Sequence, residues 1–217
     1  ITPVAMEFLD NLTIRAVEKT FKKGLPIDAG ALLVTDVDGN LEDDLNFQLA
    51  QIEKVFKENG CREFKIAKDK KEAADLWFAR RNASQSITVY GSKKLNEDVT
   101  VPRSALPELL ERFYAIAEKY KINIPCFGHT GDWNVHTNVM VDGKDPEQVK
   151  IAYKAIEEVF QATIDLGGTL SGEHGIGLAK APYMRMAFTE EEMNLFKSIK
   201  KAFDPNNILN PSKMGLD

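Results

Sequence analysis

One segment of the 217-residue sequence restricts the fold more than any other. Residues 122–127 and 134–141 read as two β-strands, and only a short polar segment containing Gly131 and Asp132 separates them. So short a connection joins two strands as an antiparallel hairpin, because a parallel pair needs a crossover of a dozen or more residues. The sequence therefore predicts an antiparallel pair of strands in the second half of the chain.

Helices and strands alternate over the rest of the sequence. Apolar residues at helical spacing predict helices over residues 4–23, 41–59, 70–84, 107–120, 146–166 and 190–203, and a glycine directly follows the first, second and fifth of them. Short apolar or alternating runs predict strands over residues 31–37, 64–67 and 97–101, the first of them buried. Interleaved helices and strands with one hairpin favour an α+β fold, a mixed or antiparallel sheet covered by helices, over a doubly wound parallel sheet. The apolar positions of the last helix are predicted to be core: Leu195, Phe196, Ile199 and Phe203.

The composition excludes some classes of partner. Lys and Arg number 28 against 33 Asp and Glu, a net charge of −5, so no basic field attracts nucleic acid. No apolar run approaches the roughly 20 residues of a membrane helix, and we expect no transmembrane segment. Cys61 and Cys126 are too few for a disulfide framework, which favours the cytoplasm, with peripheral association at the inner face of the membrane as an alternative.

The three histidines lie in glycine-rich polar segments rather than on helix faces. His129 and His136 would point to opposite faces of one unbroken strand, but the turn at Gly131 lets their imidazoles converge. With Glu173 as a third ligand, they would form the donor set of a catalytic divalent metal. His174 would then point elsewhere and serve as a proton acceptor. The alternative is that each histidine is a hydrogen-bonded structural residue.

Two segments of the sequence carry a family resemblance. Residues 127–138, read FGHTGDWNVHTN, and residues 168–177, read GTLSGEHGIG, resemble the two signature segments of the C-terminal domain of FAD-linked oxidases. That family includes D-lactate dehydrogenase, the glycolate oxidase FAD subunit and D-2-hydroxyglutarate dehydrogenase. Residues 76–81, 97–103 and 203–213 also resemble it, so the likeness follows almost the whole chain in the right order.

The resemblance implies a ferredoxin-like fold and a substrate-side role. Residues 1–217 would form the substrate or cap domain, and the FAD-binding domain would lie on another segment or subunit. The chain starts at Ile1, so we expect a fragment or a separate subunit that does not hold FAD stably by itself. The implied reaction is oxidation of a small D-2-hydroxy acid to a 2-oxo acid with hydride transfer to FAD. The electron acceptor is open, and a homodimer is an alternative to a monomer.

The resemblance also implies roles for individual residues. His129, His136 and Glu173 match the ligands of a divalent metal such as zinc or manganese, and His174 matches the general base.

Other matches concern substrate and flavin. Arg80 matches an arginine that binds the substrate carboxylate, Ser84 stands where some members have threonine, and Asn138 matches a substrate-facing asparagine. Asn210 lies in a terminal segment that approaches the flavin, and Gly175 would let the backbone lie against it.

Two positions depart from the family pattern. Asn96 replaces a lysine of some members, so we expect carboxylate recognition to differ. Trp133 replaces a glycine, and its indole would either turn outward at the hairpin tip or fill part of the substrate pocket and favour small substrates.

Two other function classes are consistent with the same residues. A metal-dependent hydrolase would use the same two histidines and glutamate and would turn over an ester or amide without flavin. A non-catalytic metal-binding or assembly domain would not oxidise a hydroxy acid even beside a flavin domain.

Overall fold

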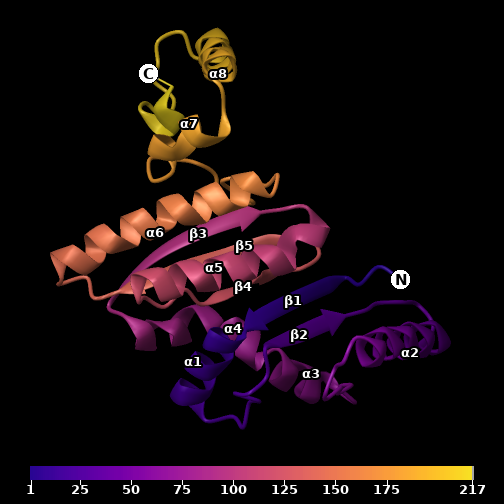
Figure 1. Ribbon diagram of the computed structural model, residues 1–217. Coiled ribbons are helices and arrows are strands. Elements are labelled where there is room, and N and C mark those ends of the chain that lie inside the picture. Colours follow the sequence, from indigo (N-terminus) through magenta and orange to yellow (C-terminus); the bar gives the residue numbers. More distant parts are fainter. Residues whose placement is uncertain (217) are drawn as a thin grey trace. The chain divides into compact units, whose positions relative to one another are not determined.

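The computed structural model describes residues 1–216, which divide into two compact units (Figure 1). The first unit contains residues 1–89 and 127–131. The second contains residues 90–126 and the chain from residue 132 onward. We describe each unit by itself.

The first unit is built on the antiparallel strand β1 (Ala5–Asp10). It pairs with β2 (Ala31–Asp36) on one side and with residues 127–129 of β4 (Cys126–His129) on the other. Helices α1 (Asn11–Phe21) and α4 (Phe78–Ser86) pack on each other and on β1, whereas α2 (Glu42–Glu58) buries no residue. The short helix α3 (Lys70–Leu76) precedes α4. The buried apolar side chains of this unit include Phe8, Leu9, Ile14, Val17, Ala83 and Ile87.

The helix expected over residues 4–23 is wrong in its first third, where the chain forms β1. The Asp10 carboxylate accepts a hydrogen bond from the Thr13 backbone N–H at 2.8 Å and so caps a helix that begins only at Asn11. Residues before this cap are extended because two remote segments, β2 and β4, pair with them. The apolar stripe read as one helix is therefore divided between a strand and a helix.

Three smaller expectations for the first unit are also corrected. Residues 64–67 form no strand, since no strand lies beside them, and Phe64 packs edge-to-face on Phe56 of α2 instead. The helix expected over residues 70–84 is two helices that meet at Trp77, whose indole N–H donates to the Asp36 carboxylate. Strand β2 is present but not buried, because it pairs with β1 alone and leaves Leu33 exposed.

The second unit contains the predicted hairpin. The Asn138 N–H donates to the Pro125 carbonyl at 3.2 Å, and Asn123 bridges Met140 antiparallel, which confirms the reversal of the chain. On its other side β5 (Asn134–Val141) pairs antiparallel with β3 (Lys93–Thr100).

Helices cover the strands of the second unit. Helix α6 (Pro146–Asp165) lies along β3 and β5 and packs on α5 (Leu106–Tyr120), as Figure 1 shows. Every residue of β5 is buried. Antiparallel strands covered by helices confirm the predicted α+β class.

The C-terminal helices differ from the expected core packing. Helix α7 (Met184–Ala187) contacts α6, and α8 (Glu190–Phe203) starts with a capping box between Thr189 and Glu192. The predicted core positions of α8 are largely solvent-exposed: Leu195 is 58%, Ile199 49% and Phe203 84% exposed. The helix is confirmed, but only part of its apolar face is covered within residues 1–216, where Met193 is buried and Phe196 packs on Phe188. No helix in that range is long and apolar enough to span a bilayer.

Candidate functional site

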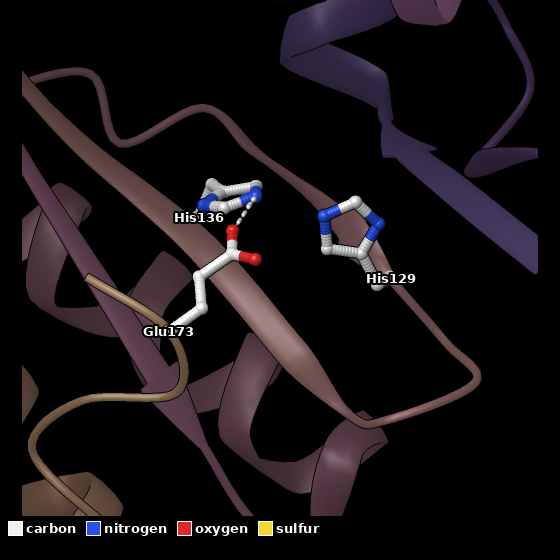
Figure 2. Close-up of side chains that lie close together, drawn as sticks. All are labelled: His129, His136 and Glu173. Atoms are coloured by element: carbon white, nitrogen blue, oxygen red, sulfur yellow. Dashed lines mark ion pairs between the residues drawn. The ribbon is translucent and has the colours of Figure 1, made fainter. Parts of the chain in front are cut away.

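Strand β5 and the loop after α6 bring three of the predicted site residues together in the second unit. The Nε2 atom of buried His136 lies 3.3 Å from a carboxylate oxygen of Glu173, the ion pair dashed in Figure 2. The His174 ring stacks on the His136 ring with 5.3 Å between centroids and 20° between planes. The predicted base thus lies directly beside a predicted ligand.

A buried carboxylate of β3, Asp98, fixes the loop that carries Glu173 and His174. Its Oδ2 atom accepts hydrogen bonds from three consecutive backbone N–H groups: Gly172 at 3.0 Å, Glu173 at 2.6 Å and His174 at 2.7 Å. The Ser171 hydroxyl donates to Asp98 at 3.1 Å. The loop conformation therefore depends on one side chain that the sequence analysis did not identify.

Lys180 completes the cluster around Asp98. The buried ammonium pairs with the Asp98 carboxylate and donates to the backbone carbonyls of Leu170 at 2.8 Å and Asp98 at 3.1 Å. Burial alone would raise the pKa of Asp98, but the hydrogen bonds from Lys180 and from the backbone N–H groups of His174 and Glu173 lower it to about 2. Asp98 is therefore ionised at neutral pH and also lies 3.4 Å from His174 Nδ1.

A second buried carboxylate, Glu7 of β1, organises predicted residues of the first unit. Its Oε1 atom lies 2.6 Å from Nδ1 of His129, and its Oε2 atom accepts a hydrogen bond from Nε of Arg80 at 2.6 Å. The Arg80 guanidinium lies 5.1 Å from the centroid of the Phe127 ring. The sequence analysis missed Glu7 because it placed this residue in a helix, where its alignment with β4 could not be foreseen.

Figure 2 labels the three residues of the predicted donor set: His136 and Glu173 belong to the second unit and His129 to the first. Two imidazoles and a carboxylate are suitable ligands for a divalent metal. The donor chemistry of the predicted set therefore fits a metal ion.

The predicted substrate residues have different environments. The Asn138 side chain is buried, donates to the Pro125 carbonyl at 3.2 Å and accepts from Asn96 at 2.8 Å. Ser84 is exposed on α4, one turn after Arg80. Contact of Asn138 and Ser84 with substrate stays a prediction.

The predicted flavin-side residues are both exposed. Gly175 has a φ of +78° and Asn210 a φ of +51°. In the same loop as Gly175, Gly172 is required for packing, since a Cβ there would lie 2.6 Å from Thr100 Oγ1 and 2.7 Å from Asn134. The glycines thus serve the loop's own packing and backbone conformation, and the contact of Gly175 and Asn210 with flavin stays a prediction.

Trp133 occupies the turn between β4 and β5. Its φ of +63° lies in the left-handed region, where a glycine would be unstrained. The half-buried indole has the guanidinium of Arg103 4.6 Å from its centroid, so the ring packs against a side chain of its own unit.

Comparison with known proteins identifies the family. The sequence profile described as FAD linked oxidases, C-terminal domain, matches residues 1–214. The glycolate oxidase subunit GlcD of Bacillus subtilis is 38% identical over 214 residues, which are 99% of this chain and 45% of that protein. The D-lactate dehydrogenase of Anaerostipes hadrus is 30% identical over 99% of this chain and 46% of its own length.

A solved structure supports the fold. The 4-ethylphenol oxidase from Gulosibacter chungangensis, in its isoeugenol complex, superposes with a TM-score of 0.66 at 15% identity, covering 98% of this chain and 47% of that one. The chain thus spans a little less than half the length of the relatives it matches. With the profile matched over nearly every residue, this chain belongs to the FAD-linked oxidase family, whose C-terminal domain it represents.

Proposed function

We propose that residues 1–217 are the substrate-side domain of a flavin-dependent 2-hydroxy-acid oxidoreductase of the glycolate oxidase or D-lactate dehydrogenase type. Relatives with those names match 99% of the chain. The observation that carries the proposal is the pair of His136 and Glu173 in the second unit, with His174 stacked beside it. The substrate is a small D-2-hydroxy acid or glycolate, and the product is a 2-oxo acid.

His129, His136 and Glu173 would hold a divalent metal, zinc or manganese. Support comes from the donor set and from the 3.3 Å distance between His136 Nε2 and the Glu173 carboxylate. When bound, such an ion would lower the pKa of the substrate hydroxyl, as metals do for bound water.

His174 removes the hydroxyl proton. Its Nδ1 atom faces the ionised Asp98, which favours the tautomer with a hydrogen on Nδ1 and leaves Nε2 as the acceptor. The backbone N–H bonds to Asp98 hold the loop in place, so the base is positioned before substrate binds.

Arg80 binds the substrate carboxylate. Its Nε atom is bonded to Glu7, so the terminal guanidinium nitrogens are the ones that form the charge-assisted fork. Ser84 and Asn138 are proposed as further substrate contacts.

The hydride acceptor is FAD, a cofactor that the family supports and that a separate FAD-binding domain or subunit would mainly bind. Gly175 and Asn210 are proposed to lie on the flavin side. The exposed apolar residues of α8 and of the segment after it supply a surface suited to that domain: Leu195, Ile199, Phe203, Ile208 and Leu209. The cytoplasmic location and a homodimer stay predictions, and the electron acceptor stays open.

Dye reduction by the chain combined with its FAD-binding domain tests this function. We expect glycolate or D-lactate to reduce the dye and His174→Ala to abolish turnover with the flavin still bound. Tyr153→Ser, a change at an exposed side chain of α6, serves as control and should leave the rate unchanged. Ester or amide hydrolysis without flavin would instead support a hydrolase, and no oxidation with either acid would support a non-catalytic assembly domain.

A further inference from the structure

We infer that Glu7 is a positioning residue that orients the metal ligand His129 and the carboxylate-binding Arg80 together. The inference rests on the proposed function, because it deepens the account of the same site. It is argued from contacts within the first unit alone.

The geometry divides the two oxygens of Glu7 between two partners. Glu7 lies opposite His129 where β1 and β4 pair, and each carboxylate oxygen has one nitrogen at 2.6 Å, His129 Nδ1 on Oε1 and Arg80 Nε on Oε2. The residue is 6% exposed, so water does not compete freely for these bonds. A buried carboxylate is stable only when it is paired with a cation or hydrogen-bonded, and Arg80 is the cation that pairs with Glu7.

The contact with His129 selects one tautomer. A carboxylate that pairs with the Arg80 guanidinium only accepts hydrogen bonds, so His129 Nδ1 carries the hydrogen at this distance. Nε2 is then the nitrogen that can bind a metal, and the ring plane is fixed by the bond on its other side. Carboxylate partners of this kind usually raise metal affinity or activity by roughly 10–100-fold.

The contact with Arg80 fixes the guanidinium plane in the same way. Nε is held by Glu7, and the Phe127 ring lies against the guanidinium, with the side chain 15% exposed. One carboxylate thus sets the direction of a metal ligand and of a substrate ligand. Glutamine at this position would place an N–H₂ donor where one of the two partners requires an acceptor oxygen.

Metal titration of Glu7→Gln is the first test. Calorimetry of the whole chain with Zn²⁺ or Mn²⁺ should give a dissociation constant roughly 10–100-fold weaker than wild type. Glu18→Gln is the matched control, because Glu18 also accepts hydrogen bonds in this unit, from the Lys23 and Leu25 N–H groups, but contacts neither His129 nor Arg80. Wild-type affinity in Glu7→Gln would overturn the inference.

A second readout needs no metal and leaves Glu7 unchanged. Long-range ¹H–¹⁵N spectra of the metal-free wild-type chain, assigned by single histidine-to-alanine changes, should show His129 with its hydrogen on Nδ1. A hydrogen on Nε2 instead would overturn the role of Glu7. A wild-type chain that binds neither ion but shows the Nδ1 hydrogen would overturn the metal ligand set and keep the orienting contact, so the two failures are distinguishable.

Discussion

Trp133 combines backbone strain with a favourable side-chain contact. A φ of +63° costs a non-glycine residue about 1–2 kcal/mol, whereas a cation–π contact such as that with Arg103 contributes roughly 0.5–1 kcal/mol. We expect Trp133→Ala to keep the strain and lose the contact, and Trp133→Gly to lose both. The glycine variant should therefore have a free energy of unfolding about 1 kcal/mol above that of the alanine variant in urea titrations. An alanine variant of equal or greater stability would contradict this.

Glu97 couples stability to pH. Burial raises its pKa from 4.5 to about 7, although the nearby Lys180 ammonium lowers it, and Oε2 has no hydrogen-bond partner among the described residues. The folded state therefore binds more protons than the unfolded state between these two values. The free energy of unfolding should fall as pH rises from about 4.5 to about 7, by on the order of 3 kcal/mol from this group.

Glu97→Gln should remove that contribution. Urea unfolding at pH 5 and pH 8 measures it as the difference between wild type and variant. We expect the free energy of unfolding of the variant to rise relative to that of wild type at pH 8. The change in this free energy between pH 5 and pH 8 should be smaller in the variant than in wild type. Parallel pH dependence in both proteins would show that Glu97 ionises normally.

At the scale of elements, the loop carrying Glu173 and His174 is held to β3 by Asp98. Asp98→Asn removes the charge that faces the buried Lys180, and breaking a buried pair in this way costs about 3–5 kcal/mol. Hydrogen exchange at the amides of residues 172–174 should become faster, because those amides donate to Asp98.

The matched control for this loop is Asp142→Asn. Asp142 accepts from the Ser92 hydroxyl and the Lys144 N–H, but at an exposed site. Asp142→Asn should lower the free energy of unfolding by less than about 1 kcal/mol. Equal destabilisation by the two variants, with unchanged exchange at residues 172–174, would exclude the clamping role of Asp98.

Elements set by local sequence were predicted well, and elements set by remote partners were not. The hairpin, α6 and α8 follow from turn residues, caps and helical spacing within each segment. Strand β1 was missed because its pairing partners lie far along the chain. The predicted site residues lie in the recognisable motifs, but the carboxylates that hydrogen-bond to them lie far away in the sequence. Glu7 is 122 residues from His129, and Asp98 is 75 residues from Glu173.

At the scale of the whole molecule, this chain spans less than half the length of its relatives. Partial coverage of the relatives is consistent with the exposed apolar residues of α8, because another part of a longer protein would cover them. The helical pattern alone had assigned these residues to the core. A pattern of apolar residues predicts that a face is covered, but it does not say by which part of a protein. The proposed FAD-binding domain accounts for both observations.

Metal titration of the four site variants tests the central claim, a metal site built by His129, His136 and Glu173. Calorimetry with Zn²⁺ or Mn²⁺ should give one site in wild type, with affinity at least about 100-fold weaker in His129→Ala, His136→Ala and Glu173→Gln. His174→Ala is the internal control: its histidine is adjacent to a ligand but is assigned to proton transfer, so affinity should stay within about threefold of wild type. No binding by wild type, or His136→Ala binding as tightly as wild type, would contradict the account.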